Sequence, residues 1–252
     1  MPRRGDESVR ASVCMATYNG QRFLGEQVRS ILDQLEPDDE LVVVDDASGD
    51  ESVVVVEGIG DPRIRLFRHA TNSGYIRTFE EALTRATGEV LLLSDQDDIW
   101  LPGHRRELVE AAGRSGVAAS NLTVLGREVG LPGPYGQSDW VLHQRDSRRT
   151  WRNLVGLFAA TRPYFGCAMA VHESMRETVL PFPAFLDESH DQWIAACGNV
   201  AGRMEHVETR TVARRLHDAN TSSPRPRGVR QVLHSRRLVV QMVLEARRRT
   251  AA

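Results

Sequence analysis

Lysine is absent from this sequence of 252 residues, so all 32 of its basic side chains are arginines. The absence excludes a Schiff-base lysine and the lysine of a P-loop, and it leaves arginine to bind any phosphate. Cysteine is scarce: Cys14, Cys167 and Cys197 lie far apart, each in an apolar stretch. This spacing is typical of neither disulfides nor zinc sites, so we expect three small buried side chains in a reduced compartment.

Long apolar runs are also missing. No stretch reaches the roughly 18 apolar residues of a membrane-spanning helix, and no apolar signal-peptide core follows the polar residues 1–10. We therefore expect a cytoplasmic protein. The formal net charge of -2 predicts no general attraction to nucleic acid.

The first half of the chain alternates short apolar runs with amphipathic stretches. Residues 23–35, for example, place Leu24, Val28 and Ile31 on one helical face. Strands that alternate with helices predict parallel βαβ units, and therefore an α/β fold with a Rossmann-like, mostly parallel sheet flanked by helices. The predicted strands are 12–16, 40–45, 64–68 and 90–93, and the predicted helices are 23–35, a short one through 53–56, and 74–86.

The second half is less regular. Residues 126–149 are rich in Gly, Pro and charge, which predicts a long surface loop. We divide the chain into a main domain, residues 10–222, and an Arg-rich tail, residues 223–252, that forms a C-terminal amphipathic helix. The predicted strands are 117–125, 167–172 and 207–216, and the predicted helices are 151–160, 191–201 and 229–249.

The most informative segment is residues 89–98, an apolar run that ends in Asp95, Asp97 and Asp98. Ligands of parallel α/β sheets collect beyond the carboxyl ends of the strands. Clustered carboxylates repel one another unless a cation binds among them, and hard oxygen ligands suit Mg²⁺ or Mn²⁺ together with substrate phosphates. The alternative interpretation is an acidic turn that only caps the next helix.

Two further turns predict half of a nucleotide site. The first strand is followed by Tyr18, whose ring could stack on a base, and the second ends at Asp45 and Asp46, whose carboxylates could accept hydrogen bonds from a base or ribose. The alternatives are a packed turn tyrosine and a helix cap. No Gly-x-Gly-x-x-Gly follows the first strand, which argues against a dinucleotide-binding domain.

These segments occur in an order and at a spacing that resemble the family 2 inverting glycosyltransferases of the GT-A fold. Residues 12–20, 42–48, 72–74 and 92–100 carry the resemblance in the first half. Residues 164–170 and 190–193 resemble the rhamnosyltransferase-like branch, and Arg215-Leu216-His217 with Asn220 continues that pattern. Arg214 departs from it, because an aromatic residue is common there.

The resemblance implies a site for a nucleoside-diphosphate sugar. Tyr18 and Asp46 would hold the base, with Asp45 nearby. Asp97 would be the main ligand of Mg²⁺ or Mn²⁺, and Asp95 would face the ribose or sugar. His217 is a candidate further metal ligand, since a neutral imidazole can complete such a coordination shell, and a structural histidine is the alternative.

The resemblance also implies a catalytic base, Asp191, which would take the proton from the acceptor hydroxyl; the alternative is a helix cap. Gly166 would allow close approach near the acceptor, and Trp193 would either stack on a sugar or belong to the core. Arg77 is either a phosphate contact or a solvated charge. The acceptor would be a saccharide or a lipid-linked molecule, in cell-surface polysaccharide or glycolipid biosynthesis.

Two other functions remain open from the sequence. A nucleotidyltransferase would also use metal-binding carboxylates, but it normally needs a Gly-rich basic loop after the first strand, and residues 17–21 lack one. A catalytically silent nucleotide-sugar-binding protein predicts the loss of Asp97 or Asp191, and both are present. The Arg-rich tail could lie on the inner face of an anionic membrane as a peripheral contact or dock on the main domain, and the sequence does not decide between them.

Overall fold

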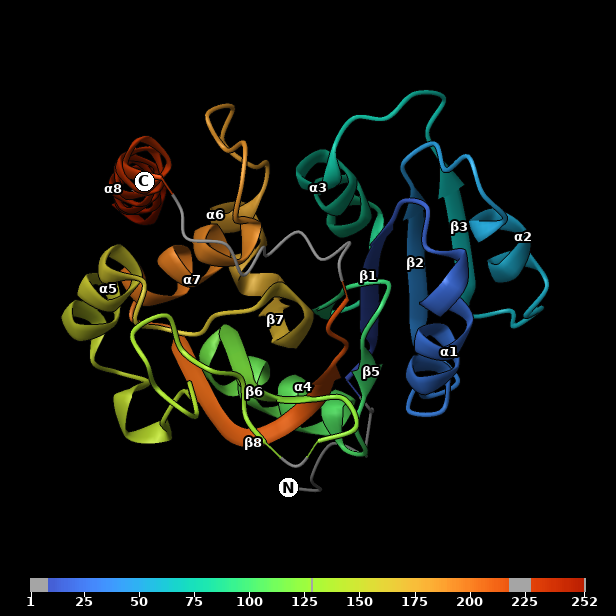
Figure 1. Cartoon of the computed structure of the whole chain (residues 1–252), viewed down its shortest axis with the longest axis horizontal. Coiled ribbons are helices and arrows are strands. Elements are labelled where there is room, and N and C mark those ends of the chain that lie inside the picture. The colour runs from blue at the N-terminus through green and yellow to red at the C-terminus, as the bar shows by residue number, and fades with distance from the viewer. Residues whose placement is uncertain (1–8, 128, 218–227, 252) are drawn as a thin grey trace, which may run out of the picture.

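The computed structural model describes residues 9–127, 129–217 and 228–251, and these contain one eight-stranded sheet in the order β3-β2-β1-β4-β7-β6-β8-β5 (Figure 1). The first four strands pair in parallel, as the alternation of strands and helices predicts. Their elements are β1 (Ala11–Thr17), α1 (Gln21–Leu32), β2 (Glu40–Asp45), α2 (Ser52–Glu57), β3 (Ile64–Arg68), α3 (Tyr75–Arg85) and β4 (Val90–Ser94).

The second half makes the sheet mixed. β7 runs antiparallel to both β4 and β6, β8 runs parallel to β6, and the short β5 pairs antiparallel with β8. The predicted α/β fold with a helix-flanked sheet is confirmed, and β5 and α6 are additions to it. The elements are β5 (Ile99–Trp100), α4 (His104–Ser115), β6 (Val117–Val124), α5 (Thr150–Ala159), β7 (Met169–His172), α6 (Arg176–Val179), α7 (His190–Val200), β8 (Met204–Arg214) and α8 (Val229–Ala251).

Both faces of the sheet are covered by helices, which explains the unbroken apolar runs in the central strands. In β2, Leu41 and Val43 join the cluster formed with α1 and α4, whereas Val42 and Val44 join the cluster formed with α3, α5, α7 and α8. Each fully buried side chain of this size contributes about 1.5–3 kcal/mol relative to its exposed state. The two cores therefore hold the strand ends, and the loops that follow them, in fixed positions.

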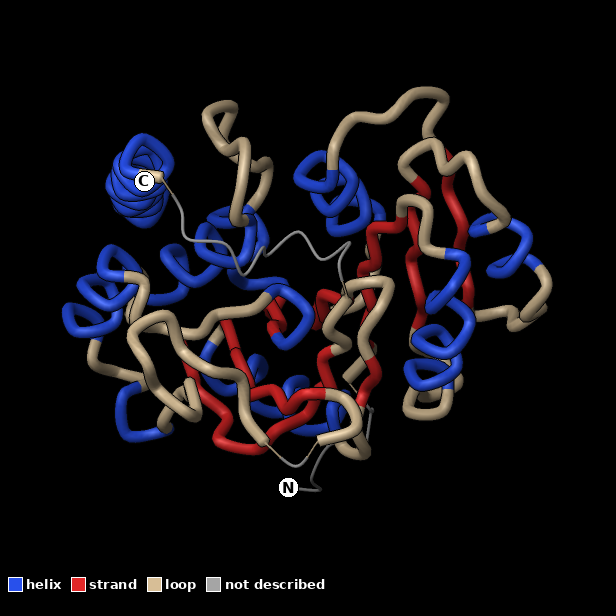
Figure 2. Tube along the Cα trace, in the orientation of Figure 1, coloured by secondary structure: helices blue, strands red, loops and turns tan. Residues whose placement is uncertain are grey.

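The described chain between β6 and α5 is mostly loop, as predicted for residues 126–149, but it contains a short 3-10 helix at Gln144–Asp146 and buries Leu131 and Leu142 (Figure 2). The predicted C-terminal helix is also present. α8 lies beside α5, α6 and α7 (Figure 1) and buries Leu238, Val239 and Met242 in their cluster. The predicted boundary between residues 222 and 223 lies outside the described residues. None of the helices in the described part of the chain has the length and apolar character needed to cross a membrane.

Candidate active site

A cleft of about 1140 Å³ opens at the edge of the sheet where β1, β4 and β8 end, and the start of α7 forms part of its wall. This is the edge at which parallel α/β sheets bind their ligands. The cleft brings together most of the residues predicted for the site: Tyr18, Asp46, Asp95, Asp97, Gly166, Asp191 and His217.

The turn after β1 is tied to the turn after β4 by Gln96, a residue that the sequence analysis did not single out. Gln96 Oε1 accepts hydrogen bonds from the Thr17 hydroxyl (2.6 Å) and the Tyr18 amide (2.9 Å), and its Nε2 donates to the Tyr18 carbonyl (3.1 Å). A side chain at Gly20 would collide with the Gln96 amide and displace it from these hydrogen bonds, so glycine at this position allows Gln96 to join the two turns. Tyr18 remains 48% exposed in the cleft wall.

The carboxylates at the end of β2 accept hydrogen bonds from neighbouring groups of the protein. The Asp46 carboxylate accepts hydrogen bonds from the backbone amides of Ser73 (2.7 Å) and Gly74 (2.9 Å), and His69 Nδ1 lies 2.8 Å from it. Although burial opposes ionisation, these hydrogen bonds hold the pKa of Asp46 below its usual value. Asp46 thus lines the cleft and fixes the turn before α3. Asp45 is fully buried and accepts the Ser48 amide (3.0 Å), and it does not line the cleft.

The carboxylates of the turn after β4 lack a comparable set of hydrogen bonds that would offset the cost of ionising them. Burial and the nearby Asp98 and Asp97 carboxylates raise the pKa of Asp95 well above its usual range. Burial and Asp97 likewise raise the pKa of Asp98, even though the Arg215 amide donates a hydrogen bond to it (3.0 Å). Ionisation of the whole cluster is therefore costly unless a positive charge enters it.

A cation would find suitable donors here. His217 Nε2 lies 2.7 Å from Asp97 Oδ2, so the end of β8 brings the predicted histidine to the predicted aspartate. Oxygen atoms of Asp95 and Asp98 lie within 4.8 Å of each other and of the Cys167 sulfur. Burial raises the pKa of the Cys167 thiol well above its usual value, and its soft sulfur is a poor match for hard Mg²⁺ or Mn²⁺. The remaining carboxylate and imidazole donors fit Mg²⁺ or Mn²⁺.

Asp191 stands in the first turn of α7, after Ser189 at the N-cap position. Burial raises the pKa of Asp191 to about 6, although the Gln192 amide, which donates to Asp191 Oδ1 (2.7 Å), opposes the shift. Ser189 has a left-handed backbone (φ 62°) and its amide donates to the Tyr75 hydroxyl (3.0 Å). A strained residue next to a carboxylate with a raised pKa is typical of a functional site.

His190 lies between this carboxylate and the core. Its ring stacks on Phe79 with the centroids 4.2 Å apart, and neither ring nitrogen has a hydrogen-bond partner within the described part of the chain. Burial lowers the pKa of His190 to about 3, so the ring is neutral. A Cβ atom at Gly166 would lie 2.7 Å from His190 Nε2. The close approach that Gly166 permits is therefore to this imidazole.

Arg214 lines the same cleft, and its guanidinium lies 5.1 Å from the centroid of the Phe165 ring. Its charge acts on Asp95, Asp98 and Asp191 and opposes the rise in their pKa values. The departure from the family pattern at this position was the only signal in the sequence. Its consequence is a fixed positive charge between the acidic turn and α7.

Besides Asp45, two predicted contacts are corrected by the structure. Trp193 is fully buried, and its indole Nε1 donates to the Val179 carbonyl (2.9 Å), so it belongs to the core and does not face an acceptor. Arg77 lies outside the cleft and forms a salt bridge with Glu80 (2.6 Å) on the surface of α3. In both cases the structure agrees with the alternative interpretation.

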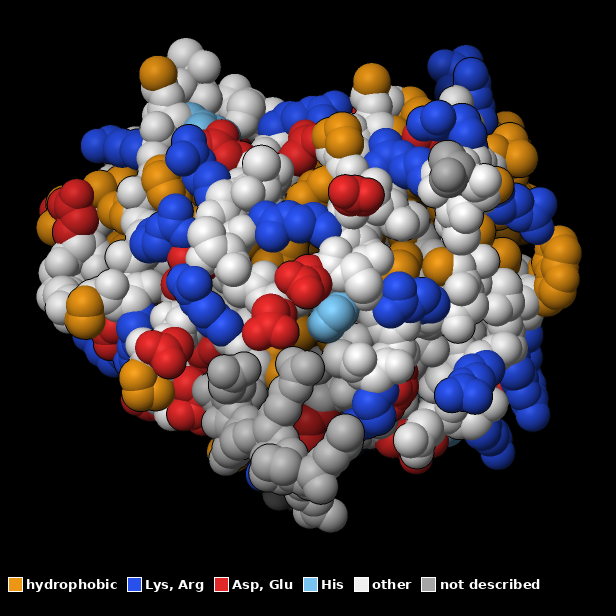
Figure 3. Space-filling view, turned by 180° about the vertical axis from the view of Figure 1, so that it is seen from behind, with side chains coloured by type: hydrophobic (Ala, Val, Ile, Leu, Met, Phe, Trp, Pro, Cys, Tyr) orange, Lys and Arg blue, Asp and Glu red, His pale blue; other side chains and the backbone are white. Residues whose placement is uncertain are grey.

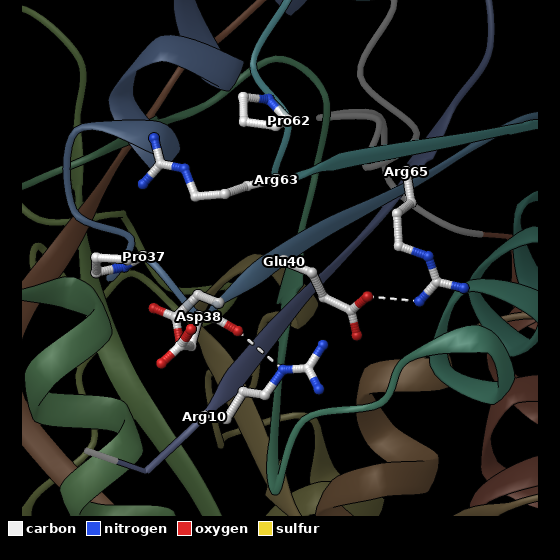
Figure 4. Close-up of a pocket in the computed structure, with 8 residues that line it drawn as sticks. Arg10, Pro37, Asp38, Glu40, Pro62, Arg63 and Arg65 are labelled. Atoms are coloured by element: carbon white, nitrogen blue, oxygen red, sulfur yellow. Dashed lines mark hydrogen bonds and ion pairs between the residues drawn. The ribbon is translucent and has the colours of Figure 1, made fainter. Parts of the chain in front are cut away.

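A second, smaller hollow of about 620 Å³ lies where β2 and β3 begin (Figure 4). Its arginines already have partners: Arg10 donates to the Asp38 carbonyl, Arg63 pairs with Asp61, and Arg65 pairs with Glu40. The cleft at the opposite ends of the strands is therefore the candidate active site.

Comparison with protein families gives one match, the glycosyl transferase family 2 model, over residues 12–173. The chain belongs to this family. The matched region runs from β1 to the end of β7 and includes the acidic turns after β2 and β4, and α7 and β8 follow it.

Curated relatives match a part of the chain only. The succinoglycan biosynthesis protein ExoO of Rhizobium meliloti (strain 1021) is 33% identical over 113 residues, 44% of this chain and 32% of that protein. The UDP-Glc:alpha-D-GlcNAc-diphosphoundecaprenol beta-1,3-glucosyltransferase WfgD of Escherichia coli is 32% identical over 90 residues, 36% of each chain. The match spans about a third of the length of the curated relatives.

Two solved structures share the fold. The crystal structure of S. aureus TarS 1–349 in complex with UDP-GlcNAc superposes with a TM-score of 0.71 at 20% identity, covering 93% of this chain and 66% of that one. Glucosyl-3-phosphoglycerate synthase from Mycobacterium tuberculosis, in complex with Mn²⁺, UDP and glucosyl-3-phosphoglycerate, has a TM-score of 0.60 at 16% identity, covering 96% of this chain and 81% of that one.

Proposed function

We propose that this protein is an inverting, metal-dependent glycosyltransferase that moves a sugar from a nucleoside-diphosphate sugar to an acceptor hydroxyl. The observation that supports this most directly is Asp191, a carboxylate whose pKa is raised to about 6 in the same cleft as the acidic turn after β4. The two features come from different elements, α7 and β4. They provide one group to accept a proton and another to engage a charged donor.

On the donor side, Tyr18 would stack on the base, and the other residues of the β1 and β2 turns that line the cleft would surround the nucleoside. The TarS complex contains UDP-GlcNAc and the glucosyl-3-phosphoglycerate synthase complex contains UDP, which supports a uridine nucleotide as the first to test. Because Asp46 is already bonded to Ser73 and Gly74, we infer that it shapes the base site through this turn.

Asp97 and His217, with Asp95 beside them, would hold Mg²⁺ or Mn²⁺. When bound, the cation would offset the negative charge of the departing nucleoside diphosphate. The carboxylates of this turn would then be ionised together, which their mutual repulsion opposes in the free protein. The Mn²⁺ in the glucosyl-3-phosphoglycerate synthase complex supports the choice of this ion for the first assays.

Asp191 would act as the general base. Inversion needs a single in-line displacement, in which the acceptor oxygen bonds to the anomeric carbon while the bond to the diphosphate breaks and the hydroxyl proton passes to Asp191. A pKa of about 6 suits this role, since the carboxylate is mostly ionised at neutral pH and still basic enough to accept the proton.

The wider role follows from the relatives and from the chain's motifs. We propose a part in polysaccharide or glycolipid biosynthesis at the cytoplasmic side of the cell envelope, because relatives carry names from succinoglycan and diphosphoundecaprenol-linked synthesis. The rhamnosyltransferase-like pattern of residues 164–170 and 190–193 makes deoxysugar donors the second class to test.

The decisive test is Asp191→Asn. This change keeps the side chain's size and removes its ability to accept a proton, so kcat should fall by roughly 10²-fold or more. Donor affinity, measured by thermal shift across UDP-, dTDP- and GDP-sugars with Mn²⁺, should stay close to that of the unmodified protein.

The matched control is Asp187→Asn, in the same segment, where the carboxylate is 62% exposed and pairs with His234. It should leave turnover unchanged. Transfer by Asp191→Asn within a few-fold of the unmodified protein would remove Asp191 as the base. Tight donor binding without any turnover in the unmodified protein would instead indicate a silent binding protein.

A further inference from the structure

α8 has two apolar faces, of which only one is used in the fold. Leu238, Val239 and Met242 are buried against the neighbouring helices. On the opposite side, Leu233, Val240 and Leu244 follow each other at spacings of seven and four residues and are 64%, 45% and 59% exposed. At about 100° per residue this spacing keeps the three side chains on one stripe of the helix.

α5 extends this stripe. Its exposed apolar side chains, Trp151 (70%), Val155 (61%) and Phe158 (46%), recur at spacings of four and three residues and so share one face. Arg236 and Arg247 of α8 join the two helices: their guanidinium groups lie 5.7 Å from the Phe158 ring and 5.3 Å from the Trp151 ring. We call this combined surface the α5–α8 face.

The α5–α8 face holds six of the fifteen large apolar side chains that are exposed in the described part of the chain. Contiguous exposed patches of this kind mark interaction sites. Arginine flanks the α8 stripe on both sides, at Arg236 and Arg247 along one edge and at Arg237 and Arg248 along the other. In Figure 3 the molecular edge that carries these helices shows hydrophobic and basic side chains next to one another.

We propose that the α5–α8 face docks on an anionic lipid bilayer. Apolar and tryptophan side chains flanked by arginine match the boundary between acyl chains and negative headgroups, where the rings and aliphatic groups leave water and the guanidinium groups meet phosphate. A second protein copy would match this pattern less well, because two such faces would bring their arginines together.

The α5–α8 face begins close to the cleft. Gln231, in the first turn of α8, lines the cleft together with Glu188 and Asp191, and Ser235 donates to Glu188 (2.8 Å). Leu233 therefore begins the exposed stripe within one turn of the cleft wall. Docking would place the acceptor side of the cleft at the lipid surface, within reach of a lipid-linked acceptor; this last step rests on the proposed function.

The experiment is flotation of the full chain with vesicles of phosphatidylcholine alone or mixed with phosphatidylglycerol. We expect binding to the mixed vesicles only, and its loss in high salt, because the Debye length falls to about 3 Å at 1 M. Arg237→Glu with Arg247→Glu should weaken binding by at least about tenfold. Trp151→Gln with Leu244→Gln should do the same through lost apolar burial.

The matched controls lie on helices of the opposite face of the sheet: Val54→Gln on α2, where the side chain is 63% exposed, and Arg106→Glu on α4. Both should bind like the unmodified chain. All variants should keep their circular dichroism and hydrolyse nucleotide sugar in solution at the unmodified rate, which separates docking from catalysis. Binding to neither kind of vesicle, or a lipid-free dimer that Leu244→Gln dissociates, would overturn the proposal.

Discussion

The turn after β2 and the turn after β4 each place neighbouring carboxylates at the same edge of the sheet, Asp45 and Asp46 in the first, Asp95, Asp97 and Asp98 in the second. In the first turn, amides and His69 surround Asp46 and its pKa is lowered. In the second, burial and the repulsion between neighbouring carboxylates raise the pKa values of Asp95 and Asp98.

This difference in pKa distinguishes an acidic residue that holds the turn in place, Asp46, from a cluster of carboxylates that needs a cation to be ionised together. His69 contacts Asp46 on one ring nitrogen and Glu81 of α3 on the other (2.9 Å), so the first turn is neutralised by the protein itself. The second turn lies near two arginines: the charge of Arg214 acts on Asp95 and Asp98, and Arg215 Nε donates to the Asp97 carbonyl (3.1 Å). Two motifs that look alike in the sequence are thus expected to respond differently to mutation, to pH and to divalent cations.

The largest effect should come from Asp97→Ala. Loss of this carboxylate removes the partner of His217 and the central donor of the proposed metal site, so turnover should fall by about 10²-fold or more while the fold persists. The measurements are sugar transfer with added Mn²⁺ and thermal unfolding. Full turnover of the unmodified protein in EDTA would contradict the metal assignment.

In the β2 turn, Asp46→Ala should act on stability. It leaves the backbone amides of Ser73 and Gly74 and the His69 ring without their acceptor, which should lower the free energy of unfolding by roughly 3 kcal/mol in urea titrations. Asp38→Ala, at an exposed position, should stay within about 0.5 kcal/mol. Because the pKa of Asp46 is lowered in the folded state, its contribution is present above pH ~4 and is lost as pH falls through the lowered value.

A smaller effect of opposite sign is expected for Asp95→Asn. The pKa of Asp95 is higher in the folded than in the unfolded state, so as pH rises the carboxyl group ionises first in the unfolded chain. Asp95 therefore destabilises the metal-free protein increasingly as pH rises above ~4. The substitution should therefore raise the free energy of unfolding near pH 7 by roughly 1–3 kcal/mol and have little effect below pH 4. If Asp95→Asn instead lowered the free energy of unfolding at neutral pH, the negative charge of the cluster would already be balanced in the metal-free protein.

Part of the fold around the two acidic turns could be predicted from the sequence alone. The four parallel strands and their helices follow from local periodicity, and their ends bring both acidic turns to one edge. The direction of β7 does not follow, because the four residues Met169–His172 would fit a strand of either direction. α4 was expected only as a helix after the acidic turn and was given no bounds, because small residues such as Ala111 and Ala112 form much of its buried face and weaken the amphipathic pattern.

In the site, Asp191 and Trp193 could not both face the cleft. Two positions along a helix differ by about 200°, and α7 is buried on the side of Trp193. Asp97 and His217 are 120 residues apart, and only the register of β8 brings them to 2.7 Å. The contact between His69 and Asp46 could not be predicted either, because His69 belongs to no motif that marks it as a partner.

The smallest effect should come from Arg214→Met, which keeps the aliphatic length and removes the charge near both Asp191 and the acidic turn. The positive charge of Arg214 lowers the pKa of Asp191, so its loss should raise that pKa above about 6 and move the acid limb of the kcat/KM profile to higher pH by roughly 0.5–1 unit. Arg22→Met is a suitable control, because Arg22 lines the cleft at α1 and stacks on Phe23. An acid limb that stays in place, or that moves to lower pH, would show that Arg214 does not set the proton affinity of the base.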